Sequence, residues 1–136
     1  MLTSAEQKFE SIISVLEHLS QEVKRGVPII VEGRKDLHAL NKLNIRGTVI
    51  CIKNSGKILP DLLDAVQSKS VIVLVDFDDE GITLVKIIST YLEKMGVKVN
   101  LNFWRRIKAL LNRHVKDVEG LPSYLEKLKK RVGYSS

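Results

Sequence analysis

The sequence has no long hydrophobic run and almost no cysteine, and each shortage excludes a class of protein. No apolar stretch in the 136 residues approaches the ~18 residues that a bilayer-spanning helix needs. The start, Met1-Leu2-Thr3-Ser4, lacks the basic and hydrophobic regions of a signal peptide. We therefore expect a cytoplasmic protein with no membrane partner. The single cysteine, Cys51, cannot form an internal disulfide and is interpreted as a small core residue.

Excess positive charge is also absent from the first three quarters of the chain. Residues 1–102 carry 13 Lys/Arg and 13 Asp/Glu, a net charge of zero, whereas residues 103–136 carry 9 and 3, a net charge of +6. A basic segment of this kind fits a polyanionic partner such as nucleic acid. A solubilising surface explains the charge equally well, so both interpretations stay open.

The pattern of the remaining residues predicts one α/β domain over residues 1–136, with no internal repeat. Apolar runs at 27–31, 48–52 and 71–75 indicate strands, the alternating segment 97–102 indicates an edge strand with one wetter face, and amphipathic segments between them indicate helices. A capping box, Thr3-Ser4-Ala5-Glu6, predicts that a helix over about 3–25 comes first. We expect a three-layer α/β/α sandwich, Rossmann-like, with a four-stranded, mainly parallel sheet. A basic helical extension over about 103–136 completes it.

The stretch at residues 71–81 carries the most chemistry, because a buried strand runs directly into four carboxylates and Gly81. If the chain stays extended, Asp76 and Asp78 point to the same side, roughly 6–7 Å apart. Ligands of parallel sheets bind at the carboxyl ends of the strands. Two carboxylates placed there suit a shared hard cation.

A third carboxylate, Glu32, ends the apolar run at 27–31. If the two strands are neighbours, Glu32 meets Asp76 and Asp78 at one edge, where three acids repel one another unless a cation lies among them. All the ligands are oxygen and no His/Cys set favours zinc, so the pattern predicts Mg²⁺. Gly33 and Gly81 would let the backbone approach the ion or a phosphate.

Together these motifs resemble the Toprim domain family, which includes bacterial-type primases, topoisomerases, recombination proteins and nucleases that mature 5S ribosomal RNA. The resemblance covers about 26–102 and rests on Val31-Glu32-Gly33-Arg34-Lys35-Asp36 and Val75-Asp76-Phe77-Asp78-Asp79-Glu80-Gly81. The tail over 116–122 is similar to that of the small stand-alone Toprim proteins of archaea. The resemblance implies that Glu32 is a general acid/base or metal ligand, and that Asp76 and Asp78 bind Mg²⁺, for which Mn²⁺ can substitute.

Basic residues are expected to hold the phosphodiester of DNA or RNA. Arg34, Lys35 and Lys53 follow the same strand ends as the acids. In the C-terminal extension, the candidates for phosphate contact are Arg105, Arg106, Lys127 and Lys130. Trp104 is either a base-stacking residue or a core residue that closes the sheet.

The other acids at the strand ends have a simpler interpretation. Asp36, Asp79, Glu80 and Asp117 are each interpreted as residues that favour a helix N-terminus. The chain has neither the tyrosine-bearing domain of a topoisomerase nor the template-binding and zinc modules of a primase.

Three functions stay open: a metal-dependent nuclease, a nucleic-acid-binding module without catalysis, and a subunit of a larger DNA- or RNA-processing complex. A receiver-like or dehalogenase-like phosphotransfer domain fits less well, because those families carry their paired aspartates at the first strand, whereas here Asp76 and Asp78 follow the third. Whether the protein is an enzyme, and whether it forms a homodimer or binds another protein, is left open by the sequence.

Overall fold

The computed structural model describes residues 2–54, 62, 65–111 and 113–133. One of the amphipathic segments between the predicted strands, at 58–66, lies mostly outside the described residues, as does part of the polar stretch 53–57 before it. Among the helices that are described, none combines the length and the apolar character needed to cross a membrane.

The architecture is α/β, as predicted, with a four-stranded parallel sheet in the order β2-β1-β3-β4. The strands are β1 (Ile29–Val31), β2 (Val49–Cys51), β3 (Ser70–Val73) and β4 (Lys98–Asn100). Strands β1 and β3 lie in the middle, with Ile29 opposite Ile72 and Ile30 opposite Val73. The neighbouring position of these two strands brings their carboxyl ends together.

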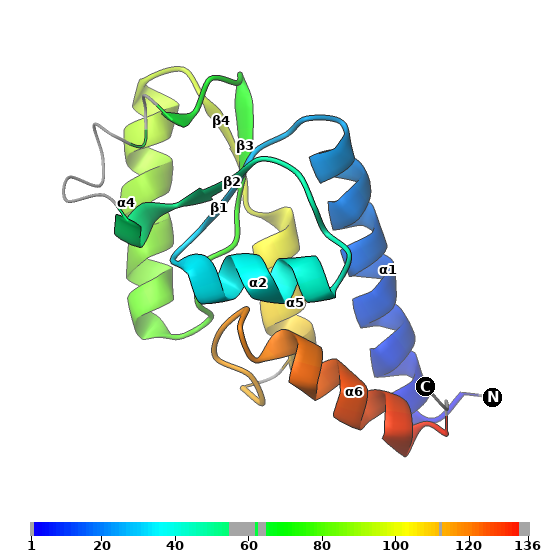
Figure 1. Ribbon diagram of the computed structural model, residues 1–136. Helices are drawn as coiled ribbons and strands as arrows, with labels where there is room; N and C mark the ends of the chain where they lie inside the picture. Colours follow the sequence, from blue (N-terminus) through cyan, green and yellow to red (C-terminus); the bar gives the residue numbers. More distant parts are fainter. Residues whose placement is uncertain (1, 55–61, 63–64, 112, 134–136) are drawn as a thin grey trace.

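Helices cover both faces of the sheet (Figure 1). They are α1 (Ser4–Lys24), α2 (Arg34–Lys42), α4 (Asp79–Lys94), α5 (Asn102–Leu111) and α6 (Leu121–Arg131), with a short 3₁₀ helix η1 (Ile52–Asn54) after β2. Helix α4 lies on one side of the sheet, and α1 lies on the other, where it packs against α5 and α6. This arrangement is consistent with the predicted three-layer sandwich with helical additions at both ends.

The first helix begins where the capping box predicts. Thr3 is the N-cap of α1, and its hydroxyl oxygen accepts from the backbone N–H of Glu6 at 3.1 Å. The Glu6 carboxylate reaches back to the same hydroxyl, 3.1 Å away. Local chemistry alone therefore sets this end of the helix.

Burial explains why the strand-forming runs carry no polar alternation. Every residue of β1 and the whole run Val71–Val75 are buried, since both faces of the central strands are covered. The strands are shorter than predicted: β1 begins at Ile29 rather than Val27, and β3 ends at Val73, although the Leu74 N–H still donates to the Ile30 carbonyl at 2.8 Å. Cys51 is free and half-buried, packed against the core rather than within it.

Candidate functional site

Glu32 and Asp76 meet at the carboxyl edge of the sheet, as expected if β1 and β3 are neighbours. The backbone N–H of Asp76 donates to Glu32 Oε2 at 2.8 Å, across 44 residues of sequence. The other oxygen, Oε1, lies 3.5 Å from Lys53 Nζ, and the Lys53 backbone N–H donates to the Glu32 carbonyl at 2.9 Å. The Glu32 side chain is only 12% exposed, against 68% for Lys53. Glu32 is thus held by the Asp76 backbone and lies beside an exposed cation.

The surroundings of Asp76 disfavour a second negative charge there. Burial, the charge of Glu32 and a hydrogen bond between the two carboxyls, in that order, raise the pKa of Asp76 from 3.8 to about 7. The charges of Asp36 and Asp117 add to the shift. Such clustering of like charges is typical of sites built for a cation or for proton transfer.

Asp36 and Asp117 are the site residues that sequence reasoning missed. Asp36 is 7% exposed, and one of its oxygens accepts from the Gly33 N–H at 3.1 Å. Burial raises the pKa of Asp36 above 3.8, opposed by the backbone N–H of Gly33 and increased by the charges of Glu32 and Asp117. The prediction that Asp36 favours a helix N-terminus holds for its bond to Gly33, but its carboxylate also belongs to the acidic edge.

Asp117 reaches the edge from the far end of the chain. Its Oδ1 accepts from the Gly120 N–H at 2.8 Å, in the connection between α5 and α6. The residues around Asp117 in the sequence do not distinguish a site residue from an aspartate that only caps a helix. The one available signal was the resemblance of the segment 116–122 to stand-alone archaeal proteins.

Asp78 does not extend toward Glu32 along a continuing strand, because the regular strand has already ended at Val73. Instead Asp78 is the N-cap of α4, and its Oδ1 accepts from the Gly81 N–H at 2.9 Å. Asp79 and Glu80 lie exposed in the first turn of that helix, as interpreted from the sequence. Within the described ranges, no three His, Cys, Asp or Glu side chains form a group that could already hold a metal ion. The oxygen donors are present, but Asp78 is engaged in capping.

Gly81 is required by a close approach of two backbone segments. A Cβ atom at this position would lie 1.8 Å from the Asp76 carbonyl oxygen. Gly33 has open space, with nothing within 4 Å of a Cβ atom. Gly81 therefore lets the start of α4 pack against the Asp76 backbone, a packing role that differs from the expected approach to an ion or a phosphate.

The C-terminal extension completes the edge rather than lying apart from it. The Phe77 N–H donates to the Lys116 carbonyl at 2.6 Å, which joins the α5–α6 connection to the end of β3. The indole N–H of Trp104 lies 3.2 Å from the carbonyl oxygens of both Val75 and Asp76. Trp104 is 7% exposed. Of the two interpretations of Trp104, the core one holds, and the residue also fixes the backbone that carries Asp76.

The predicted phosphate-contacting residues are dispersed. Arg34 and Lys35 are exposed in the first turn of α2, beside the edge, and Lys53 contacts Glu32. Arg105 lies against β4, in a hollow with Lys98 and Asn100. Of the α6 residues, Lys127 lines a hollow with Asp117, and Lys130 is exposed.

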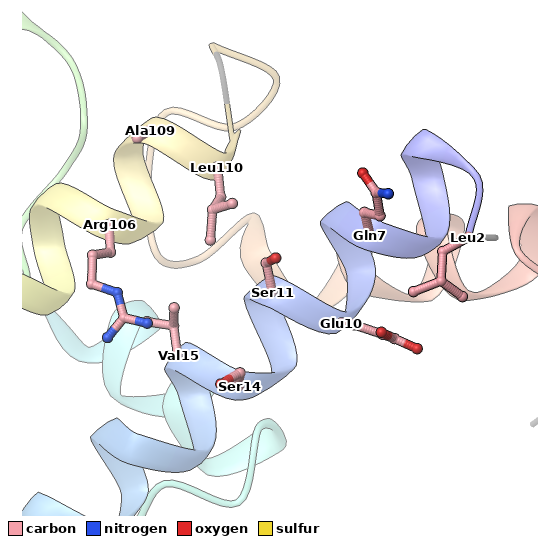
Figure 2. Close-up of a pocket in the computed structure, with 9 residues that line it drawn as sticks. All are labelled: Leu2, Gln7, Glu10, Ser11, Ser14, Val15, Arg106, Ala109 and Leu110. Atoms are coloured by element: carbon pink, nitrogen blue, oxygen red, sulfur yellow. The ribbon is translucent and has the colours of Figure 1, made fainter.

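Arg106 points away from the edge. Figure 2 shows it on α5, directed toward α1 across a groove of about 600 Å³ that Glu10, Ser14 and Val15 also line. No cluster of titratable groups accompanies it there. The groove is therefore separate from the acidic edge.

A second cleft, of about 500 Å³, adjoins the acidic edge. Its walls come from the end of β3 and start of α4 on one side, and from α5 and the α5–α6 connection on the other. The lining residues are Phe77, Asp78, Asp79, Ile82, Lys108, Ala109, Arg113, Val115 and Lys116. This cationic cleft, as we call it after its three basic residues, shares Asp78 with the predicted metal motif.

The chain is similar in sequence to several archaeal proteins. It is 37% identical over 123 residues to the UPF0292 protein of Methanocaldococcus jannaschii, covering 90% of this chain and 95% of that protein. It is 40% identical over 106 residues to the UPF0292 protein of Thermoplasma volcanium, covering 75% and 85%. The UPF0292 protein of Methanosarcina barkeri is 31% identical over 130 residues, covering 96% and 91%.

A solved structure of a protein from Aquifex aeolicus has the same fold. The two superpose with a TM-score of 0.66 and 29% sequence identity, over 78% of this chain and 94% of that one. No family model matches the chain.

Proposed function

The chain belongs to the UPF0292 family, and for this member we propose a Toprim-like, divalent-metal-dependent activity on the phosphodiester bonds of nucleic acid in the cytoplasm. The observation that carries the proposal is the meeting of Glu32 and Asp76, 2.8 Å apart from carboxylate oxygen to backbone nitrogen. With Asp36 and Asp117 acting on the same carboxyl, the edge holds more negative charge than Lys53 alone can neutralise.

The donor set fits a hard cation. Glu32, Asp76 and Asp78 would hold Mg²⁺, with Mn²⁺ as a substitute, and the ion would neutralise phosphate charge and lower the pKa of a bound water. Asp78 would contribute its second carboxylate oxygen, because Oδ1 accepts from the Gly81 N–H. Asp76 would lose its proton on binding the ion, because burial and the neighbouring acids raise its pKa and so favour its protonated form without metal.

Glu32 is proposed as the general acid/base. Its carboxylate is oriented by the Asp76 N–H through one oxygen, which limits the directions in which it can exchange a proton. Lys53, being largely exposed, is free to turn from Glu32 toward a phosphate. Arg34 and Lys35, at the start of α2, would hold the strand on the same side.

A second candidate is a nucleic-acid-binding module, or a subunit of a larger complex, without catalysis of its own. The observation that favours it is the capping bond of Asp78, which leaves only two of the three predicted ligands, Glu32 and Asp76, in direct contact. A receiver-like or dehalogenase-like phosphotransfer domain has less support, because the Asp76/Asp78 pair follows the third strand along the chain.

Cleavage assays on single- and double-stranded DNA and RNA, with Mg²⁺ or Mn²⁺, distinguish the metal-dependent enzyme from the non-catalytic module. The variants are Glu32→Gln and Asp76→Asn, with Glu17→Gln on the exposed face of α1 as the control. Loss of the acid/base should reduce the cleavage rate on the order of a hundredfold or more, while Glu17→Gln cleaves normally. Cleavage that survives both changes would remove the catalytic assignment. Metal-dependent binding with no cleavage by the unmodified protein would favour the module.

A further inference from the structure

The cationic cleft is a charged surface that has no role in the chemistry proposed above. Lys108 lies on α5, and Arg113 and Lys116 lie on the connection that crosses to α6. Opposite them are Asp78 and Asp79, at the start of α4. Three cations thus line a cleft that opens beside the acidic edge.

None of these three cations forms an ion pair with an acidic side chain of the described residues. The ion pairs found within the described residues are Arg25 with Glu22 and Lys53 with Glu32. Asp78 lines the cleft but caps α4 through Gly81. The positive charge of the cleft is therefore available to a ligand from outside.

Two backbone hydrogen bonds anchor parts of the segment that carries Arg113 and Lys116. The Lys116 carbonyl accepts from the Phe77 N–H, and Val115, the residue before it, is 8% exposed. The His114 N–H donates to the Leu111 carbonyl at 2.9 Å. Arg113 is held in the left-handed region, with φ 69°, which a non-glycine residue adopts only where its surroundings require it. The two hydrogen bonds place the described part of the α5–α6 connection beside the segment that carries Asp76 and Asp78.

An aromatic pair lies on the other side of the same segment. His114 and Tyr124 stack with ring centroids 6.0 Å apart and an interplanar angle of 15°. They line a hollow of about 290 Å³, of which Val115 and Lys116 are also part. Aromatic rings stack on unpaired bases, whereas the bases of a duplex are stacked on each other. The segment therefore combines phosphate-binding and base-stacking side chains.

We propose that the cationic cleft binds the phosphodiester backbone of a single nucleic-acid strand and leads it to the acidic edge. This inference rests on the proposed function and specifies its substrate as a single strand. A volume of about 500 Å³ lies within the ~300–1,000 Å³ of small-ligand pockets, so it takes a short segment of one strand, not a duplex. Lys108, Arg113 and Lys116 bind phosphates, and the His114–Tyr124 pair receives a base.

The test measures binding of fluorescein-labelled oligothymidylate and oligouridylate, by fluorescence anisotropy over a salt series in the presence of a chelator. The variant replaces Lys108, Arg113 and Lys116 by Gln. The charge-matched control replaces Lys24, Lys69 and Lys94 by Gln, since these exposed lysines lie just before β1, β3 and β4, at the amino ends of the strands and opposite the acidic edge. Circular dichroism checks that each variant is folded.

The cleft variant should bind more weakly at every salt concentration, and its slope of log K against log salt should be smaller by about 2, at ~0.7 per phosphate contact on a single strand. The control should keep the slope of the unmodified protein, and a duplex should compete poorly. Equal slopes for the cleft variant and the control would show that the cleft cations do not bind the strand, while leaving the proposed function intact. Absence of binding by the unmodified protein at low salt would overturn the cleft assignment, and if Mg²⁺ did not restore binding it would overturn the proposed function as well. Tighter binding of the duplex would overturn the single-strand assignment.

Discussion

The acidic edge and the cationic cleft lie side by side, yet they are built in opposite ways. At the edge, the carboxylates of Glu32, Asp36 and Asp117 each accept from a backbone N–H, at 2.8 to 3.1 Å. In the cleft, the cationic side chains are solvent-accessible, and no acidic residue of the described chain pairs with them. The edge therefore holds its charges in a defined geometry, as catalysis requires. The cleft leaves its charges free to adapt to a bound strand. Substitutions at the edge should therefore cost stability, and those in the cleft should cost binding.

The largest expected loss of stability follows from Gly81→Ala. The added methyl group would lie 1.8 Å from the Asp76 carbonyl oxygen, and a backbone atom cannot yield as a flexible side chain can. We expect the free energy of unfolding to fall by at least the ~1–3 kcal/mol of an overpacked core. Urea unfolding followed by circular dichroism measures it. Gly33→Ala is the matched control, because nothing lies within 4 Å of its Cβ position, and a similar loss there would contradict the explanation.

The next effect is a dependence of stability on pH. The pKa of Asp76 is raised in the folded protein, from 3.8 to about 7, so folding favours its protonated form. The stabilisation is complete below the unfolded pKa and is lost as the pH rises toward the folded value. Without divalent metal, the free energy of unfolding should therefore fall between about pH 4 and pH 7 on account of this residue. Asp76→Asn should flatten the profile, whereas an unchanged profile would show that Asp76 does not titrate there.

Trp104→Phe should have a smaller effect on stability. The change keeps an aromatic ring in the core but removes the N–H that lies 3.2 Å from the carbonyls of Val75 and Asp76. Loss of this hydrogen bonding should lower the free energy of unfolding by about 1 kcal/mol. Because the same bonds fix the Asp76 backbone, we also expect weaker Mn²⁺ binding by calorimetry. Mn²⁺ affinity equal to that of the unmodified protein would limit Trp104 to packing.

The smallest change in stability should come from the cleft itself. Lys108, Arg113 and Lys116 project from the surface without ion-pair partners among the described residues, so each replacement by Gln should alter the free energy of unfolding within about 0.5 kcal/mol. Thermal unfolding of the triple variant measures the sum. A large loss would mean that these residues hold the α5–α6 connection in place, and the contrast with the edge would disappear.

Much of the fold was predictable because its causes are local. The Thr3 cap needs only Glu6 nearby, and the runs that end before Glu32 and Asp76 show buried parallel strands through their lack of alternation. The ends of the elements were less predictable. Asp78 was expected to extend a strand, but a carboxylate three residues before Gly81 caps a helix equally well, and the sequence does not separate the two.

The residue pattern is enough to predict the α/β class, the strand-end position of Glu32 and Asp76, and the concentration of positive charge in the last quarter of the chain. Three features become visible only in the folded protein: β1 and β3 are neighbours, Asp36 and Asp117 act on Asp76, and Lys108, Arg113 and Lys116 share one cleft with Asp78. The physical reason is that strand order and the packing of the C-terminal extension come from contacts between distant segments. Hydrophobic periodicity reports which face of an element is buried, but not which element covers it.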